Sequence, residues 1–342
     1  MTVFVGIDIA KASFATATCV DGTSQTLGVF PNTRAGFEAL VAQLREAVRS
    51  RESAVQVIIE PTGGYEVPLA RFVLEHGWQV SMPNPRHVRD WAKSQGRRAK
   101  TDAQDALLLA RYGAEQPVRP WRPLPAAVSE LESLLQRRDD LEQLIGQERN
   151  RQHALGHRPD VAPAVDASVA AILHALEASL STVTRAINEH LEQQPRLREG
   201  VRLLRTVPGV GERNVLWLLV LLHRWQTLTD GEGLGKGLVA YLGLDPQPFE
   251  SGSSVRRRAR ISRMGAAHLR RRLFMSALGG TRGHNALRQF YLRLVGRGKP
   301  KKVALIAAAR KVLVWAWAVF RTRTAFDPTR IPRRPPMLPA SP

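Results

Sequence analysis

The chain has 342 residues, an apolar content of 44% and a net charge of +20, so it is long enough to bury a large core and to form roughly two or three units. A single cysteine, Cys19, excludes a disulfide framework and a cysteine-based zinc site, and fits a reducing, cytoplasmic setting. Charged residues interrupt both the apolar start, at Asp8, and the apolar run at 303–320, at Arg310. These interruptions argue against a signal peptide and a membrane span.

The positive charge is concentrated in the last part of the sequence. Residues 251–342 hold 22 lysines and arginines against one acidic residue, Asp327, whereas residues 1–250 hold 28 against 29. A basic block of this kind is typical of nucleic-acid binding. A membrane-surface module and a merely solvated basic face are the alternatives, and the first would leave the acidic residues described below without a function.

The first hundred residues alternate between expected strands and helices. We expect three short strands at 3–9, 14–19 and 25–29, then a helix over 34–49, a strand at 55–59, a helix over 66–75, a strand at 78–82 and a basic helical stretch at 86–93. Apolar, β-branched runs predict the strands, and apolar residues spaced three and four apart predict the helices. An initial three-strand meander followed by alternating elements predicts a mixed sheet covered by helices.

Two of the expected strands carry an acidic residue. Asp8 lies within an apolar run, and Glu60 follows the strand 55–59, just before a turn of proline and glycine. A lone carboxylate in such a run is costly unless it is paired or binds a metal ion. The alternative interpretation is that both residues only cap turns.

A second pair of acidic residues lies in the stretch 98–106. Asp102 and Asp105 are three residues apart at the start of an apolar helical run, so both carboxylates lie on one face of its first turn. Taken alone, this pair favours a helix cap. Asp8 and Glu60, however, bring the number of candidate metal ligands to four. Carboxylate oxygens are the ligands that Mg²⁺ prefers. Four of them at one sheet edge suit two metal ions about 3.5–4 Å apart, as in nucleases and polymerases.

The middle of the chain is expected to be helical. Residues 117–125 contain several prolines and one tryptophan and are expected to form a linker. Within 126–198, leucine-rich runs at helical spacing are interrupted by a proline-containing break at 159–163. This pattern predicts two long helices in an antiparallel hairpin or coiled-coil arm. Dimerisation and packing within one subunit are both open as roles for this arm.

Residues 199–327 are expected to form a mostly helical domain. Its Pro208-Gly209-Val210-Gly211 stretch indicates either a helix–hairpin–helix-like turn, whose small glycines let backbone N–H groups approach a phosphate, or a plain helix-joining turn. Periodicity predicts helices at 266–279, 285–295 and 303–320. The proline-rich tail, 328–342, is expected to be disordered.

A serine-containing loop precedes these helices. Ser251, Ser253 and Ser254 lie beside a run of arginines, a residue type that binds phosphate bidentately. A serine hydroxyl at such a place could attack a phosphodiester if another group deprotonates or orients it, although composition alone favours a polar linker with a phosphate-binding tail. The basic candidates for nucleic-acid contact are Lys100, Arg256, Arg257, Arg258, Arg260, Arg270, Arg271, Lys299, Lys301 and Lys302.

Five motifs occur in one order along the chain. They are Gly6-Ile7-Asp8-Ile9-Ala10-Lys11, Glu60-Pro61-Thr62-Gly63, Lys100-Thr101-Asp102-Ala103-Gln104-Asp105-Ala106, Pro208-Gly209-Val210-Gly211, and Tyr241-Leu242-Gly243-Leu244 ahead of Glu250-Ser251-Gly252-Ser253-Ser254. Each motif is weak alone. Together, over roughly residues 3–328, they resemble the DEDD transposases of bacterial insertion sequences related to the Piv invertase, a family of bridge-RNA-guided recombinases.

The resemblance implies a RuvC-like, RNase H-type catalytic domain at 1–116 and a C-terminal transposase domain at 199–327. Asp8, Glu60, Asp102 and Asp105 fill the family's four acidic positions and would bind two Mg²⁺ ions, with Mn²⁺ as the alternative ion. Ser251 matches the nucleophilic serine of the family. That serine attacks a DNA phosphate and forms a covalent phosphoserine link, so strands are exchanged without net hydrolysis.

The resemblance also implies partners. One subunit of a homodimer or homotetramer would supply the metal ligands of a composite site, and another subunit the serine. Donor and target double-stranded DNA would be paired with a structured noncoding bridge RNA encoded by the element, in the bacterial cytoplasm and at the nucleoid, with no membrane involved. One alternative is a RuvC-like hydrolytic nuclease, such as a junction resolvase, that uses the same acids without the serine. Another is a nucleic-acid-binding protein without chemistry.

Overall fold

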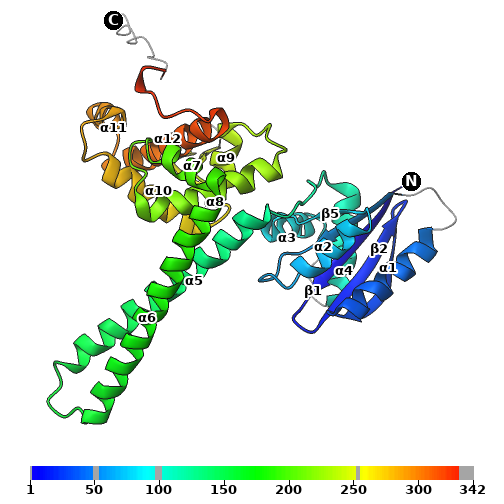
Figure 1. Ribbon diagram of the computed structural model, residues 1–342. Helices are drawn as coiled ribbons and strands as arrows, with labels where there is room; N and C mark the ends of the chain where they lie inside the picture. The colour runs from blue at the N-terminus through cyan, green and yellow to red at the C-terminus, as the bar shows by residue number, and fades with distance from the viewer. Residues whose placement is uncertain (1, 49–53, 97–101, 252–254, 331–342) are drawn as a thin grey trace, which may run out of the picture. The chain divides into compact units, whose positions relative to one another are not determined.

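The structure, a computed structural model, describes residues 2–48, 54–96, 102–251 and 255–330 (Figure 1). The side chains of residues 47, 48, 102, 103, 248–251 and 255–259 also lie outside that description. The chain divides into two compact units, unit 1 (Met1–Pro123) and unit 2 (Leu124–Pro342).

Unit 1 is built on a five-stranded mixed sheet with the order β3-β2-β1-β4-β5. Strands β1 (Thr2–Ile9), β2 (Ser13–Val20) and β3 (Thr23–Pro31) form an antiparallel meander. Strands β4 (Ala54–Ile59) and β5 (Gln79–Ser81) continue the sheet parallel to β1. The mixed sheet confirms the architecture predicted from the alternating apolar runs, and its strand order agrees with an RNase H-type domain.

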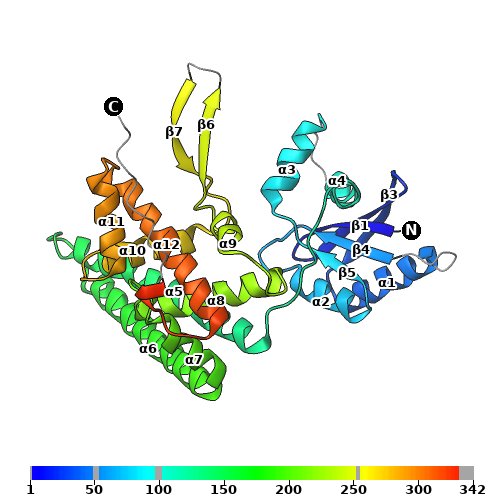
Figure 2. The same ribbon diagram turned by 90° about the horizontal axis from the view of Figure 1, so that it is seen from above.

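Helices cover both faces of this sheet (Figure 2). Helices α1 (Arg34–Val48) and α2 (Val67–Glu75) pack on one face, where the apolar side chains of Leu40 and Leu69 join those of Ile7 and Ile59 in one core. Helix α4 (Asp102–Glu115) packs on the other face, with α3 (Pro85–Ser94) beside it. The alternation of side chains along each strand separates these two apolar layers.

The end of unit 1 lies against the sheet. The backbone N–H of Trp121 donates to the carbonyl of Val80 at 2.6 Å, and the Trp121 ring packs against the core beneath α1 and α2. Pro120 forms an isolated bridge with Ser81. The division between the units, after Pro123, therefore falls within the stretch that we expected to be a linker.

Unit 2 begins with two long helices, α5 (Ala126–Leu155) and α6 (Pro163–Gln193), which pack along each other (Figure 1). Ile145 of α5 meets Val169 and Leu173 of α6 in a cluster distant from the other helices. Leu131 of α5 and Ile187 of α6 instead join the main core of unit 2. The pair is therefore antiparallel, and both helices lie where the leucine spacing predicts them.

The remainder of unit 2 is a helical domain. Its helices are α7 (Pro195–Leu204), α8 (Glu212–Leu228), α9 (Gly235–Tyr241), α10 (Ala267–Gly280), α11 (Ala286–Gly296) and α12 (Lys301–Thr322), followed by a 3₁₀ turn at Pro328–Arg330. Among the described helices, α6 and α12 are long and apolar enough to cross a membrane. Most of the apolar stretch of α12 is buried against α7, α8, α9 and α10, so α12 is the core helix of this domain.

A β-hairpin replaces the loop that we expected around Ser251 (Figure 2). Strand β6 (Pro246–Ser251) pairs antiparallel with β7 (Val255–Ile261), from Pro246 opposite Ile261 to Ser251 opposite Val255. The prediction of a loop was wrong. The many arginines of β7 do not form the apolar alternation by which a strand is recognised in a sequence, although a connection of three residues with a glycine between two segments does indicate a hairpin. Residues 331–342 of the tail that we expected to be disordered lie outside the described residues.

Candidate active site

Two of the four acidic residues lie side by side at the end of the sheet. The pairing of β1 with β4 matches Ile7 with Ile59, and the N–H of Glu60 donates to the carbonyl of Ile7 at 3.4 Å. Asp8 and Glu60 therefore occupy the next register position of two neighbouring parallel strands. Because Ile7 and Ile59 are buried on the α1 and α2 face, the alternation of side chains directs Asp8 and Glu60 to the face covered by α4.

Helix α4 lies unusually close to strand β1. A Cβ atom built on Gly6 would lie 2.0 Å from the carbonyl oxygen of Ala106 and 2.3 Å from the amide nitrogen of Ala110. Only a glycine at position 6 allows this approach of helix backbone to strand backbone. Gly6 is two residues before Asp8, on the same face of the strand, so this contact fixes the distance of α4 from the acidic position.

The direction of α4 decides which of its ends meets the acidic residues. Farther along the helix, a Cβ atom on Gly113 would contact Phe4 and Ile58, so α4 runs antiparallel to β1. The turn that precedes Ala106 therefore extends toward the strand end that carries Asp8 and Glu60. That turn contains Asp102 and Asp105, and the structure thus brings all four acidic positions to one end of the sheet.

The ligand set for a metal pair remains a prediction. Among the side chains that the structure describes, no group of three or more His, Cys, Asp or Glu residues is spaced to hold a metal ion. The side chain of Asp102 lies outside that description. Glu60 forms an ion pair with Arg89, 3.5 Å between Oε1 and Nη2, in which the arginine is exposed. Because the arginine is open to solvent, the pair contributes little stability. Carboxylate oxygens at the four positions are the donor type that Mg²⁺ prefers.

A buried carboxylate that the sequence analysis did not single out supports this site. Glu66 is 7% exposed, and its Oε2 accepts hydrogen bonds of 3.0 Å from the N–H groups of Thr62 and Gly64. Gly63 and Gly64 have φ values of +63° and +99°, a conformation that glycine adopts without strain. Glu66 therefore holds the loop that begins directly after Glu60. The turn of proline and glycines was visible in the sequence, but the identity of its anchor was not.

Asn32, at the end of β3, joins the two segments that follow the acidic strands. Its Nδ2 donates to the carbonyl of Ala10 at 3.1 Å and to the carbonyl of Tyr65 at 3.4 Å. Ala10 comes two residues after Asp8, and Tyr65 belongs to the loop after Glu60. The side chain therefore limits the separation of the two chain segments behind the site.

Ser251 belongs to unit 2, where its backbone ends β6 next to the connection of the hairpin. At the opposite end of the hairpin, Asp245 and Ser262 form its root, joined through Ser262 Oγ to Asp245 Oδ1 and through Ser262 N to the Asp245 carbonyl. Gly243 and Gly265 both have positive φ values. They let the segment before β6 and the segment after β7 contact each other through their backbones. The serine is thus held from the root of a two-stranded element.

Arg270 has a structural role that its basic surroundings concealed. Its Nη1 donates to the carbonyls of Leu242, Met264 and Gly265 at 3.2, 2.9 and 2.8 Å. Burial, together with the nearby charge of Arg263, lowers the pKa of Arg270. The side chain that we expected to contact nucleic acid therefore fastens the root of the hairpin to α10.

The other basic candidates divide into two groups. Exposed side chains, which remain available for contact with nucleic acid, are Arg260, Arg271, Lys299, Lys301 and Lys302. Lys100 and the side chains of Arg256, Arg257 and Arg258 lie outside the described residues, although the three arginines belong to the backbone of β7.

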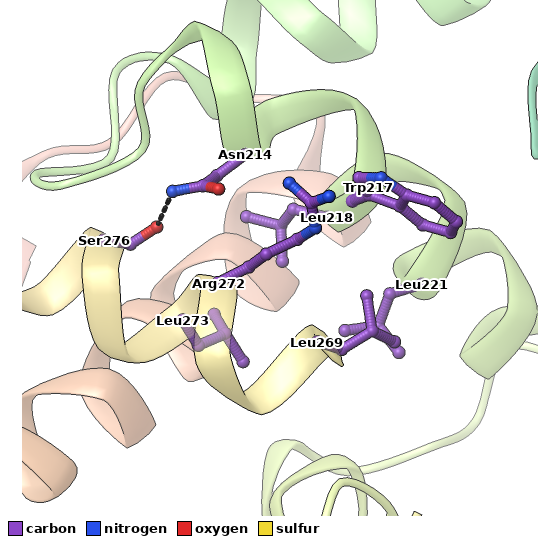
Figure 3. Close-up of a pocket in the computed structure, with 8 residues that line it drawn as sticks. All are labelled: Asn214, Trp217, Leu218, Leu221, Leu269, Arg272, Leu273 and Ser276. Carbon is purple, nitrogen blue, oxygen red and sulfur yellow. Dashed lines mark hydrogen bonds between the residues drawn. The ribbon is translucent and has the colours of Figure 1, made fainter. Parts of the chain in front are cut away.

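The Pro-Gly-Val-Gly turn between α7 and α8 packs against α10. Gly209 has φ +91°, and a Cβ atom there would lie 2.4 Å from the carbonyl oxygen of Ser276. Asn214 Nδ2 donates to Ser276 Oγ at 2.9 Å across the same contact (Figure 3). The cavity between these helices is about 10 Å³, which is room for no more than a water molecule. Packing alone therefore explains Gly209, and the observation favours a helix-joining turn.

Comparison with known proteins decides the family. A domain family described as "Transposase" matches residues 5–155, and "Transposase IS116/IS110/IS902 family" matches residues 201–292. The chain belongs to the IS110 family of transposases. It is 35% identical to the "Pilin gene-inverting protein" of Moraxella lacunata and to that of Moraxella bovis, over 95% of this chain and 97% of each relative. These matches confirm the family that the five motifs indicated.

Two further matches cover smaller parts of the chain. The chain is 31% identical to the "Insertion element IS110 uncharacterized 43.6 kDa protein" of Streptomyces coelicolor over 48% of this chain and 38% of that protein. A solved structure, "T. thermophilus RuvC in complex with Holliday junction substrate", is 13% identical and covers 35% of this chain and 100% of its own, with a TM-score of 0.28. That score is too low to support a fold, which rests here on the strand order.

Proposed function

We propose that this IS110-family transposase cleaves, exchanges and rejoins DNA strands by combining a carboxylate-bound metal pair with a serine nucleophile. The observation that carries the proposal is the position of Asp8 in β1 beside Glu60, which directly follows the neighbouring β4, with the first turn of α4 at the same end of the sheet. Four acidic positions at one end of a sheet are unfavourable for a protein that only binds nucleic acid, because carboxylates repel each other and a phosphate.

Asp8, Glu60, Asp102 and Asp105 would hold two divalent ions, Mg²⁺ or Mn²⁺. When bound, such a pair polarises the scissile phosphate and stabilises the attacking and leaving oxygens. The residues of this chain set the geometry. The sheet holds Asp8 and Glu60, the contact of Gly6 with Ala106 sets the height of α4, and Glu66 holds the loop after Glu60.

Ser251 is the proposed nucleophile. Its hydroxyl would lose a proton as Oγ forms a bond to phosphorus, and the bond from phosphorus to one sugar oxygen would break, leaving a hydroxyl on that strand. A sugar hydroxyl of another strand would then attack the phosphoserine and release the serine. The number of phosphodiester bonds is unchanged, which suits recombination because no bond energy is lost to water.

The partners follow from the same scheme. Donor and target DNA are the substrates, and exposed basic side chains supply affinity for the phosphate backbone that does not depend on sequence. The choice of sequence is assigned to a bridge RNA encoded by the element. The metal ligands of one subunit and the Ser251 of another would form each composite site in a homodimer or homotetramer, in the cytoplasm at the nucleoid.

A strand-transfer reaction tests the proposal. It contains Mg²⁺, joined-end donor DNA, target DNA and RNA transcribed from the flanking noncoding region, and protein–DNA adducts are separated on a denaturing gel. We expect an adduct that requires Mg²⁺ and the RNA, that disappears in Ser251→Ala and Asp8→Asn, and that persists in the matched control Ser253→Ala.

Other outcomes have definite meanings. Cleavage without an adduct, unaffected by Ser251→Ala, would identify a RuvC-like hydrolytic nuclease. An adduct lost in Ser253→Ala but retained in Ser251→Ala would identify Ser253 as the nucleophile in place of Ser251. Activity unchanged by Asp8→Asn would contradict the metal site and favour a protein that binds nucleic acid without chemistry.

A further inference from the structure

A cavity beside the root of the serine hairpin has no role in the scheme above. It has a volume of about 480 Å³ and lies among α9, α11, α12 and the residue that precedes β6. The polar and aromatic side chains that line it are Lys236, Asp245, Phe290, Arg310 and Lys311. Cavities that bind small organic groups are typically about 300–1,000 Å³. The size alone therefore permits a ligand much larger than a water molecule or an inorganic ion.

The walls of this cavity combine an apolar floor with positive charge. Ala307 and Val314 lie on the same face of α12 as Arg310 and Lys311, because residues three, four and seven apart share one face of a helix. Lys236 of α9 adds a third cation. The result is an apolar surface bordered by three positive side chains and one carboxylate.

The cavity is lined by more positive than negative side chains. Within the described part of the chain, neither Lys236 nor Arg310 has a carboxylate at ion-pairing distance. Lys311 Nζ lies 5.6 Å from the centre of the Phe290 ring and 6.0 Å from that of Trp315. This cation–π contact places positive charge beside an aromatic ring at the border of the cavity, a combination that suits an anionic ligand with its own flat, apolar part.

The chemistry of the ligand follows from this combination. An inorganic anion would make no favourable contact with the apolar floor. A neutral apolar ligand would desolvate charged side chains and offer them no charge in return. A nucleotide has both required parts, a phosphate for Lys236, Arg310 and Lys311 and a base for Phe290 and the floor. Phosphate contact together with an aromatic side chain is the usual way in which proteins hold an unstacked nucleotide.

We propose that this cavity binds one unstacked nucleotide of a nucleic-acid strand that runs along the serine hairpin. Asp245 lines the cavity and immediately precedes β6, whose last residue is Ser251. Six strand residues span about 20 Å at roughly 3.3 Å each, which equals about six stacked nucleotides at roughly 3.4 Å. The cavity would thus anchor the strand at a set distance from the phosphate that Ser251 attacks, and this role rests on the proposed function.

Photocrosslinking tests where the nucleotide lies. Substrate strands carry 5-iodouracil at single positions between three and nine nucleotides from the exchanged phosphate, in one series in the DNA and in another in the RNA. We expect irradiation of the assembled full-length protein to produce a crosslinked peptide that contains Phe290, with a maximum about six nucleotides away. The series that gives the crosslink identifies the strand as DNA or RNA. Crosslinks that map only to other peptides would overturn the proposal.

A comparison of variants with equal charge tests the contribution of the base. The double variant Lys236→Ala/Arg310→Ala is compared with Arg196→Ala/Arg198→Ala, which removes the same charge from exposed positions of α7. Each protein is titrated with the strand that crosslinks best and with the same strand made abasic at that position. Wild type and the α7 variant should bind the abasic strand about tenfold more weakly, because holding an unstacked base contributes substantially to affinity. The cavity variant should show no such difference.

Two further results keep this inference separate from the recombinase mechanism. Ser251→Ala should retain the Phe290 crosslink although it forms no adduct. If the wild-type protein gives the crosslink but no adduct, nucleotide binding in the cavity is supported and the proposed function is contradicted. An equal loss for the abasic strand in all three proteins would mean that the base is not held in the cavity. If the double variant is unstable, Lys236→Glu at an exposed position of α9 replaces it, with the same expected result.

Discussion

The acidic end of the sheet and the serine hairpin are held in opposite ways. Asp8, in β1, and Glu60, directly after β4, lie at one end of a five-stranded sheet, with α4 packed against Gly6 so closely that a methyl group has no space. Ser251 lies at the far end of two strands that pair with each other and are fastened at their root by Arg270. An isolated two-stranded hairpin is only marginally stable.

This difference corresponds to the two tasks proposed for the regions. A metal site requires its ligands to be held to about half an ångström, which a packed sheet and helix provide. A nucleophile has to reach a phosphate on a large substrate, which a projecting hairpin allows. The packed sheet is therefore rigid where the proposed metal ligands need fixed positions, and the hairpin extends from its domain where the proposed nucleophile has to reach a large substrate. Three substitutions and one change of pH follow from this contrast, in order of expected effect.

Gly6→Ala should have the largest effect. The added methyl group would meet the backbone of α4 at 2.0 and 2.3 Å, and overpacking against rigid backbone costs about 3 kcal/mol. Urea denaturation followed by circular dichroism should show this loss, together with the loss of adduct formation. In Gly146→Ala, the new methyl group of α5 meets nothing within 4 Å, so a gain of up to about 1 kcal/mol is expected. Full stability of Gly6→Ala would contradict the described contact.

Arg270→Ala should weaken the hairpin while sparing the sheet. The change leaves the carbonyls of Leu242, Met264 and Gly265 without their common donor. Because hydrogen bonds to charged groups contribute about 1.5–3 kcal/mol, we expect a loss of about 2 kcal/mol in unit 2 and faster amide exchange in β6 and β7. The neighbouring Arg271 is exposed, and Arg271→Ala should leave both quantities unchanged. Equal rates of amide exchange in the two variants would show that Arg270 does not stabilise the root of the hairpin.

Glu66→Ala should loosen the acidic end without removing any proposed ligand. Two backbone N–H groups would lose their hydrogen bonds to a charged acceptor, and such bonds contribute about 1.5–3 kcal/mol. The Mg²⁺ concentration required for half-maximal adduct formation should rise severalfold. Since one oxygen accepts both bonds, Glu66→Gln should restore most of the wild-type value. Glu75→Ala, at an exposed position of α2, is the control. A rise in the required Mg²⁺ that glutamine does not rescue would indicate a role for the charge itself.

Acid should destabilise unit 2 through His223, with the smallest of the four effects. Burial, reinforced by the charge of Arg323, lowers the pKa of His223 to about 4, compared with 6.5 for an unburied histidine. The unfolded chain therefore binds a proton that the folded chain does not, so stability falls as the pH drops from about 6.5 toward 4. At pH 5 the loss should be roughly 1–2 kcal/mol relative to pH 7.5.

Thermal melting at a series of pH values measures this effect. His223→Phe should remove much of the acid sensitivity. Burial and the charge of Arg272 also lower the pKa of His268, so His268 contributes in the same direction. His284→Gln, at an exposed position, should leave the pH profile as it is. A profile that does not respond to His223→Phe would show that other groups govern acid unfolding.

The sequence predicted unit 1 better than the surroundings of Ser251, for physical reasons. Val3 to Ile9 and Val55 to Ile59 are runs of apolar, β-branched residues with a single structural solution, buried strands. An acidic residue in or directly after such a run stands out, so Asp8 and Glu60 could be found by inspection. Strand β7 is instead rich in arginine, and its pairing with β6 depends on a partner strand that contains two prolines.

Roles that depend on backbone contacts could not be predicted. Glu66 is important because two N–H groups converge on its carboxylate, and Arg270 because three carbonyls converge on its guanidinium. Sequence shows the residue type but not which backbone groups the fold leaves near it. Gly209 is the converse case, since a glycine that suggested phosphate binding is accounted for by its contact with Ser276.

The position of α12 in the core of unit 2 has a consequence for synthesis of the protein. Val312, Leu313 and Ala316 of this helix are buried among residues contributed by helices formed much earlier. Unit 1 can fold once its 123 residues have left the ribosome, whereas the core of unit 2 has to wait for residue 322. At about 5–20 residues per second, the sheet that carries Asp8 would stand complete for some tens of seconds before the core of unit 2. On the proposed mechanism, a nascent chain would therefore be unable to attack DNA with Ser251 until almost all of its sequence had been translated.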